Sequence, residues 1–132
     1  MEIVLTSEVH TALIAAARAA HPLEACGILL GKGRRITAAR PARNVHASPR
    51  THFEIDPQAL IDAHRAARAP GGCQVLGYYH SHPQGPAAPS ATDRAEASGD
   101  GRIWAIIAGE DVRLWRDGGA GFAALSFTII ES

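Results

Sequence analysis

The sequence predicts an α/β fold in which helices pack against a mixed β-sheet, and three observations support this fold class. The chain has 132 residues, which corresponds to about one domain of ordinary size. Hydrophobic residues make up 46% and charged residues 20%, as in typical globular proteins. Segments typical of strands and of helices alternate, without the regular rhythm of repeated strand–helix–strand units. We therefore expect one domain over residues 1–132, with a sheet of mixed strand direction.

A strand and a helix are expected first. Residues 1–5 are short and apolar, and Thr6 or Ser7 suits the N-cap position of a following helix. This helix should end near Pro22, because proline disfavours the helical conformation of the residue before it. Its apolar side chains recur at helical spacing, at Val9, Leu13, Ile14 and Ala17.

Two strands, a loop and a short third strand are expected next. Residues 28–30 form an apolar run between glycines, which is typical of a buried strand. Residues 34–40 are expected to form a neighbouring strand, and residues 41–51, which contain prolines and arginines, a loop. Phe53 and Ile55 alternate with polar neighbours and predict a short strand.

A second helix and a central strand follow. Asp56 and Pro57 mark the helix start, because aspartate suits the N-cap and proline suits the first helical position. The helix should run to about Ala69, where the segment 70–72 ends it. Residues 75–79 are apolar and aromatic, and they predict a central strand.

The last part of the chain is expected to contain a short helix and three strands. Residues 83–89 form a proline-rich loop, and residues 90–98 form a helix that Ser90 caps. The expected strands are residues 103–108, 112–115 and 122–130.

Composition excludes several classes of protein. Lys plus Arg number 13 and Asp plus Glu number 13, and a net charge of zero argues against broad electrostatic binding to nucleic acid or anionic membranes. Two cysteines, Cys26 and Cys73, are too few for a secreted disulfide scaffold of this length. We expect neither a signal peptide nor a membrane span, because no apolar run reaches about 18 residues. The expected location is the cytoplasm.

The stretch from His80 to His82, followed by Asp93, is the most informative for chemistry. Residues two apart in a strand point to the same face, so His80 and His82 can direct their imidazoles to one point. A proline-rich loop can return Asp93 to that point at the start of a short helix. Two imidazoles and a carboxylate suit zinc, and three protein ligands leave a position for water, as in catalytic sites. We predict that His80, His82 and Asp93 bind Zn2+.

A carboxylate and a hydroxyl complete the candidate site. Glu24 stands just before a predicted buried strand, which is an unusual place for a carboxylate without a function. It is the candidate general base that takes a proton from water. Ser90 can donate a hydrogen bond to the oxyanion of a tetrahedral intermediate. It can also cap the short helix together with Asp93, and the two roles are compatible.

Several neighbouring residues have structural interpretations. Ser81 should point to the face opposite the ligands and orient the loop by hydrogen bonds. Cys26 could share the face of the candidate base, but a small buried side chain is the simpler interpretation. His52 and Phe53 are candidates for the border of a substrate cleft. Trp104 lies in a predicted strand and is expected to be a core or sheet residue.

The candidate residues and their spacing resemble the motif of the JAMM (MPN-plus) zinc metalloprotease family. That motif joins a glutamate to a distant His-Ser/Thr-His-Pro and then to Ser-x-x-Asp. Here its parts are Glu24, residues 80–83 and residues 90–93, and the seven residues 83–89 provide the spacing between the second histidine and the serine. The likeness covers roughly residues 1–114 and is greatest to the small prokaryotic members of the family.

The resemblance implies the MPN fold, which is similar to that of cytidine deaminases, with Zn2+ held by His80, His82 and Asp93. It implies that Glu24 is the general base and acid, and that Ser90 is the oxyanion donor. It also implies hydrolysis of the isopeptide or peptide bond after the C-terminal Gly-Gly of a ubiquitin-like or sulfur-carrier protein. The expected partner is such a carrier, and not nucleic acid or a membrane; the sequence leaves a homodimer open.

Three other classes of function compete with a protease. A non-catalytic scaffold, or a binding module for a ubiquitin-like protein, would tolerate the loss of a ligand or of the glutamate, and every motif position is filled here. Nucleobase deaminases combine His-x-Glu with Pro-Cys-x-x-Cys, and this sequence has no Pro-Cys-x-x-Cys. A DNA-repair-associated protein with a similar motif is not supported by a net charge of zero.

Overall fold

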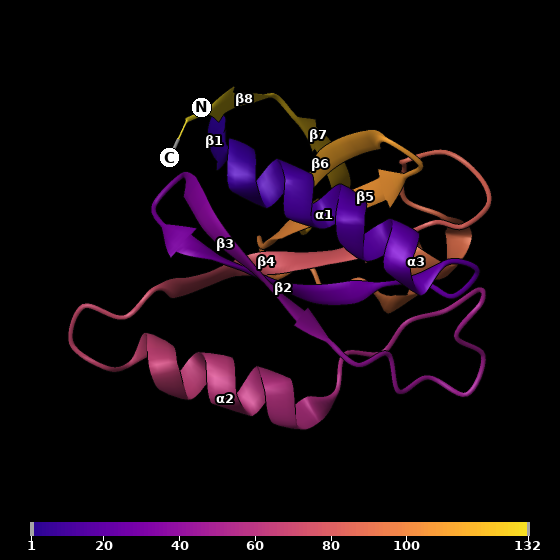
Figure 1. Cartoon of the computed structure of the whole chain (residues 1–132), viewed down its shortest axis with the longest axis horizontal. Coiled ribbons are helices and arrows are strands. Elements are labelled where there is room, and N and C mark those ends of the chain that lie inside the picture. Colours follow the sequence, from indigo (N-terminus) through magenta and orange to yellow (C-terminus); the bar gives the residue numbers. More distant parts are fainter. Residues whose placement is uncertain (1, 132) are drawn as a thin grey trace.

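The computed structural model describes residues 2–131, so Met1 of the expected first strand and Ser132 lie outside the described residues. The described chain forms eight strands and three helices (Figure 1). In chain order they are β1 (Ile3–Thr6), α1 (Ser7–Ala20), β2 (Cys26–Lys32), β3 (Arg35–Ala42), α2 (Pro57–Ala67), β4 (Gln74–Ser81), α3 (Ala91–Glu96), β5 (Ile103–Ala108), β6 (Asp111–Gly118), β7 (Gly121–Leu125) and β8 (Phe127–Ile130).

The strands form one mixed sheet, which confirms the predicted fold class. Its order is β7-β6-β5-β4-β2-β3-β1-β8. The pairs β1–β3, β1–β8 and β4–β5 are parallel, and the other neighbours are antiparallel. Only Ser126 separates β7 from β8, although these strands lie at opposite edges of the sheet. The two edges therefore meet at Ser126, and the sheet is curled.

The prediction of one strand over residues 122–130 is wrong, because the chain bends at Ser126. The C=O of Ser126 accepts a hydrogen bond from the N–H of Ile3 at 3.1 Å. Before the bend β7 pairs with β6, and after it β8 pairs with β1. The largely apolar sequence of residues 122–130 does not distinguish one long strand from two strands that pair at different edges.

The segment between β3 and α2 also differs from the prediction. β3 continues to Ala42, two residues into the expected loop. Phe53 and Ile55 do not form a strand, because Ile55 makes only an isolated bridge with Asn44. The side chain of Asn44, and not a backbone C=O, accepts the N–H of Glu54, and this interrupts the ladder.

The predicted helix starts are confirmed. Oγ1 of Thr6 accepts the N–H of Val9 at 3.3 Å before α1, and Oδ1 of Asp56 accepts the N–H of Gln58 at 3.1 Å before α2. These side chains satisfy backbone donors that the helix itself leaves free. The end of α2, at Ala67, comes two residues before the expected one.

The helix expected over residues 90–98 is α3, and it ends earlier, at Glu96. Beyond this end the N–H groups of Ser98 and Gly99 donate to the carboxylate of Asp117, at 3.2 and 3.1 Å. Asp117 is buried in β6 and therefore draws the chain out of the helical path.

Two apolar clusters cover the two faces of the sheet. The larger cluster joins α1 to Leu29 of β2 and Tyr79 of β4. The smaller cluster joins α2 to Ile28 and Tyr78, the sequence neighbours of those residues. Side chains alternate between faces along a strand, so His80 of β4 lies on the same face as Tyr78, which α2 covers.

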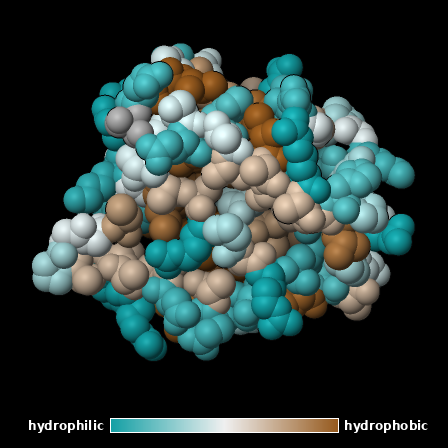
Figure 2. Space-filling view, in the orientation of Figure 1, coloured by the Kyte–Doolittle hydropathy of each residue, from teal (hydrophilic) through white to brown (hydrophobic). Residues whose placement is uncertain are grey.

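The face that carries α1 has weakly hydrophobic side chains in its middle, bordered by hydrophilic ones (Figure 2). A cavity of about 540 Å3 lies between the last turns of α1 and the end of β3, lined by small side chains such as Ala16, Ala19 and Ala20, and Glu24 borders it. None of the described helices is long and apolar enough to cross a membrane.

Candidate active site

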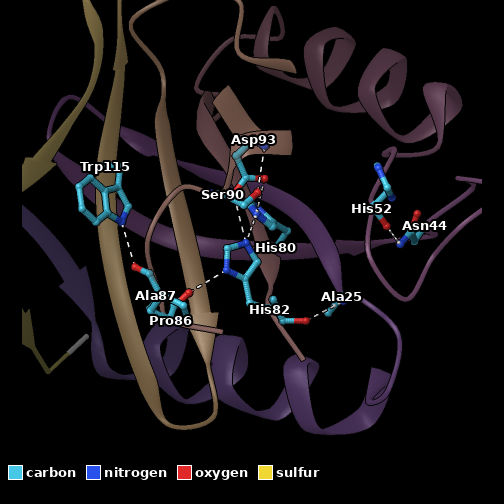
Figure 3. Close-up of polar contacts among 11 residues, drawn as sticks. Ala25, Asn44, His52, His80, His82, Pro86, Ala87, Ser90, Asp93 and Trp115 are labelled. Atoms are coloured by element: carbon cyan, nitrogen blue, oxygen red, sulfur yellow. Dashed lines mark hydrogen bonds and ion pairs between the residues drawn. The ribbon is translucent and has the colours of Figure 1, made fainter. Parts of the chain in front are cut away.

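His80, His82 and Asp93 converge on one point at the end of β4 (Figure 3). Nε2 of His80 lies 3.1 Å from Nε2 of His82 and 3.1 Å from Oδ1 of Asp93. Nε2 of His82 lies 3.1 Å from Oδ2 of the same carboxylate. All three residues are at most 9% exposed. The structure thus brings the three predicted ligands together in a buried cluster.

The two histidines are positioned by the central strand of the sheet. β4 lies between β2 and β5 and ends at Ser81, so His80 is inside the strand and His82 follows it. The N–H of His82 donates to the C=O of Ile107 in β5 at 2.8 Å, which fixes the chain just beyond β4. Oγ of Ser81 accepts the N–H of Ala25 at 2.8 Å. The predicted structural role of Ser81 is confirmed.

The first turn of α3 positions Asp93. Oγ of Ser90 accepts the N–H of Asp93 at 3.0 Å, and Oδ2 of Asp93 accepts the N–H of Ser90 at 2.9 Å. This reciprocal pair is a capping box, and it directs the carboxylate toward the histidines. The hydroxyl proton of Ser90 has no acceptor among the described residues, so Ser90 can cap the helix and still donate.

Hydrogen bonding of the ring nitrogens makes this point suitable for a cation. Nδ1 of His82 lies 2.8 Å from the C=O of Pro86, which can only accept, so Nδ1 carries a proton. Nε2 then faces the carboxylate of Asp93, 3.1 Å away: it donates a hydrogen bond when the ring is protonated and offers a lone pair when the ring is neutral. Two acceptors at this distance repel each other unless a positive charge lies between them. Imidazole and carboxylate donors with an outer hydrogen bond of this kind fit a divalent metal ion.

The pKa values within the cluster show where its protons lie when no metal is bound. Burial lowers the pKa of His80. Burial acts to lower the pKa of His82 too, but hydrogen bonds to Asp93 and Pro86 outweigh it and raise that pKa. Burial acts to raise the pKa of Asp93, but hydrogen bonds from His80 and His82 outweigh it and hold that pKa well below its ordinary value. Asp93 is thus in the ionised state that a metal ligand requires, whereas His82 must give up the proton on Nε2 when a metal binds.

Two aromatic rings fix the orientation of His80. The ring of Phe53 stacks on it at a centroid distance of 4.3 Å and an angle of 15°. Trp104 meets it edge to face at 5.6 Å, and Trp104 is buried in β5 as predicted. Nδ1 of His80 has no hydrogen-bond partner among residues 2–131, so packing alone holds that side of the ring, while Nε2 faces Asp93.

Glu24 lies beside the cluster, in the segment between α1 and β2, and is 7% exposed. Burial raises its pKa from the ordinary value of 4.5 to about 7, although the charge of His82 acts in the opposite direction. A group that titrates near neutral pH can both accept and return a proton in that range. Glu24 therefore has the properties of a general base and acid.

Besides the cavity between α1 and β3, two cavities meet at Glu24. One, of about 570 Å3, is lined by the loop after β4 and includes His82 and Ser90. The other, of about 330 Å3, is lined by the segment before α2 and includes His52 and Phe53. His52 and Phe53 thus line a cavity next to the cluster, and their place at the border of a substrate cleft stays a prediction. An extended chain that passed from one cavity to the other would cross Glu24 and the cluster.

The cysteines take no part in this site. Cys26 and Cys73 are both free, and Cys26 is buried in β2. Burial, and then the charge of Glu24, raise the pKa of the Cys26 thiol to about 12. The thiol stays protonated at neutral pH, which agrees with its interpretation as a small buried side chain.

The raised pKa of Glu24 predicts a pH-dependent stability of the metal-free protein. Burial makes the ionised form of Glu24 unfavourable in the folded protein, and this lowers the free energy of unfolding. The loss of stability is absent below about pH 4.5, grows as pH rises from there and is complete above about pH 7. Glu24→Gln should leave the melting temperature of the metal-free protein nearly unchanged at pH 4.5. At pH 8 the variant should be the more stable of the two, by up to about 3 kcal/mol. Melting curves across this range check the prediction, and a constant difference between the two proteins would contradict it.

Comparison with known proteins identifies the family. Residues 6–118 match the family described as prokaryotic homologs of the JAB domain. The chain is 41% identical over 95 residues to a desampylase of Haloferax volcanii, covering 70% of this chain and 67% of that protein. It is also 41% identical over 90 residues to a probable TtuB-protein conjugate cleaving protease of Thermus thermophilus, covering 68% of this chain and 58% of that protein.

A solved structure supports the predicted fold. The JAB1/MPN domain protein AF2198 of Archaeoglobus fulgidus superposes with a TM-score of 0.63, covering 97% of this chain and 98% of that one. Its sequence identity is 18%, so this likeness concerns the fold alone. The fold, the matched residues and the buried His-His-Asp cluster agree, and the chain belongs to the prokaryotic homologs of the JAB domain, the small prokaryotic type of the JAMM (MPN-plus) family.

Proposed function

We propose that this chain is a zinc-dependent isopeptidase or peptidase that hydrolyses the bond after the C-terminal Gly-Gly of a ubiquitin-like or sulfur-carrier protein. The observation that carries the proposal is the buried cluster of His80, His82 and Asp93 beside Glu24, where two cavities meet. The relatives support it, because one is named a desampylase and another a probable conjugate cleaving protease. The chain spans 67% and 58% of their lengths.

His80, His82 and Asp93 would hold the metal. Two imidazoles and a carboxylate are a common ligand set of catalytic zinc, which when bound lowers the pKa of water to about 7 and polarises a carbonyl. The carboxylate of Asp93 is fixed by the capping box, and the ring of His82 by the C=O of Pro86. Both ligands are therefore oriented by the protein before any metal binds.

Glu24 would move the proton. Its carboxylate accepts a proton from the attacking water and returns it to the nitrogen of the leaving amine, so that the broken C–N bond yields a carboxylate and a free amine. The hydroxyl of Ser90 borders the same cavity and donates to the oxyanion of the tetrahedral intermediate. Among the described residues, neither the carboxylate of Glu24 nor the hydroxyl proton of Ser90 has another hydrogen-bond partner that would compete with these roles.

The tail of the carrier would lie along Phe53. The backbone N–H and C=O of Phe53 make no hydrogen bond within the described residues, whereas Glu54 is bonded on both sides, to Val45 and Asn44. An extended chain can add to such a free edge, with backbone hydrogen bonds providing affinity. The ring of Phe53 contacts His80, so this edge leads to the cluster. Glycines lack the Cβ atoms that would collide in a narrow passage.

A panel of carrier fusions tests the proposal. Ubiquitin-like carriers that end in Gly-Gly and are extended by one or more residues should be cleaved after the second glycine, as mass spectrometry of the products would show. Replacing that glycine with valine should slow cleavage severely, while changing the released residue should matter less. Equal cleavage of the glycine and valine fusions, or cleavage at unrelated peptide bonds, would contradict recognition of the Gly-Gly tail and would indicate a general peptidase.

Replacing Ser90 with alanine separates its two roles. Loss of the cap should cost about 1 kcal/mol of stability. Loss of the oxyanion donor should lower kcat by roughly 10²-fold with little change in KM. Steady-state kinetics on a cleavable fusion, paired with a melting curve, measure both effects. A lower melting temperature with unchanged kcat would refute the catalytic role.

A further inference from the structure

The backbone groups of Glu24 bond to a distant loop and not to the sheet. Glu24 lies outside β2, which begins at Cys26, and so it has no strand partner. Its N–H donates to the C=O of Pro49 at 2.8 Å. Its C=O accepts a hydrogen bond from Nδ2 of Asn44 at 3.1 Å. Both backbone groups of Glu24 thus depend on residues 44–54, which we call the 44–54 loop.

The side chain of Asn44 bonds to both ends of this loop. Its Nδ2 group donates to the C=O of Glu24 and to the C=O of His52, at 3.1 and 3.0 Å (Figure 3 draws the second bond). Its Oδ1 accepts the N–H of His46 and the N–H of Glu54, both at 3.1 Å. Every hydrogen-bonding position of the amide is used. The two C=O partners and the two N–H partners also fix which end of the amide is which.

The same loop contacts a metal-ligand candidate. Phe53, between the two loop residues that Asn44 binds, stacks on the ring of His80. The loop therefore packs against Glu24 on one side and against His80 on the other. A shift of the loop would change the position of the Glu24 carboxylate relative to the cluster.

We infer that Asn44 is a positioning residue. Its side-chain amide bonds the 44–54 loop to the backbone of Glu24 and so fixes the position of the Glu24 carboxylate relative to His80, His82 and Asp93. The inference rests on the proposed function, in which Glu24 is the general base. Misplacement of a catalytic group by about 1 Å can cost on the order of 10²-fold in rate. Asn44 is the only asparagine in the chain.

Asn44→Asp is the most informative change. A carboxylate keeps both acceptor contacts within the loop, to the N–H groups of His46 and Glu54. It loses both donors, to the C=O of Glu24 and the C=O of His52, and places negative charge against these two oxygens. Gln58→Ala is the matched control, because among the described residues the side-chain amide of Gln58 bonds only to Asp62, on the surface of α2.

The first measurement is amide hydrogen exchange in the metal-free protein, which needs no activity. In Asn44→Asp the N–H of Glu24 should exchange about 10-fold faster. Its acceptor, the C=O of Pro49, belongs to the 44–54 loop, which no longer bonds to the C=O of Glu24 through Asn44. The amides of β2 should keep their protection, and Gln58→Ala should match the wild type. Unchanged exchange at Glu24 would overturn the inference, whatever the protein hydrolyses.

The second measurement is a double-mutant cycle with Glu24→Gln on a cleavable carrier fusion. Alone, Asn44→Asp should lower kcat by about 10- to 100-fold, with KM within about twofold and metal content unchanged. Combined with Glu24→Gln it should add less than about twofold, because the residue it positions is already disabled. An equal loss in both backgrounds, or a loss confined to KM, would overturn the inference. A wild type that cleaves no carrier would refute the proposed function, while the exchange result would still decide the role of Asn44.

Discussion

Glu24→Gln should lower kcat for cleavage of a Gly-Gly-extended carrier by about 10²–10⁴-fold, the range expected for a lost general acid–base. The amide has nearly the shape of the carboxylic acid but cannot take a proton from water. Glu24 is buried beside His82 and Asp93, and its pKa of about 7 suits it to this transfer near neutral pH. Single-turnover and steady-state kinetics at saturating substrate measure the loss.

Metal content and melting temperature identify the cause of that loss. The variant should bind the metal as well as the wild type does, because Glu24 is not one of the three converging ligands. Glu54→Gln is a matched control, since Glu54 borders the smaller cavity but is exposed. Turnover close to that of the wild type in Glu24→Gln would show that the base lies elsewhere.

The double variant His80→Ala, His82→Ala should lose both bound metal and measurable hydrolysis. Two of the three converging ligand atoms are removed, and Asp93 alone does not form a zinc site. Elemental analysis of the purified protein, after dialysis against zinc and then buffer, should give about one zinc per chain in the wild type and much less in the variant.

A control variant guards against adventitious binding to histidines. His10 and His64 lie on α1 and α2, away from the cluster, so His10→Ala, His64→Ala should keep both metal and activity. His82→Ala alone preserves the contacts of Phe53 and Trp104 with His80 and tests the site if the double variant is unstable. Stoichiometric zinc in the His80→Ala, His82→Ala protein would contradict the assignment.

Local sequence patterns predicted most of the fold. The N-caps at Thr6 and Asp56 act within one helical turn, so their effect can be predicted from adjacent residues. The strand pairings depend on distant residues. The bend at Ser126 exists because β1 provides a partner for β8, and no feature within residues 122–130 indicates that partner.

The convergence of the site residues could also be predicted from their spacing, because His80 and His82 are two residues apart at the end of one strand, and Ser90 and Asp93 lie in one helical turn. Two contacts that hold the site in place could not be predicted from the sequence. Pro86 contributes a backbone C=O to His82, and a carbonyl has no signature in the sequence. The contact of Asn44 with Glu24 joins residues 20 positions apart, and only the absence of any other asparagine could have drawn attention to it.

Zinc titration into the metal-free wild type tests the central claim most directly, namely that the His80, His82 and Asp93 cluster supports hydrolysis after Gly-Gly. The metal is removed by chelation, and cleavage of a Gly-Gly-extended carrier is followed by mass spectrometry as zinc is returned. We expect no cleavage without zinc, and recovery in proportion to occupancy that is complete at about one zinc per chain. Undiminished cleavage by the metal-free protein would contradict the account.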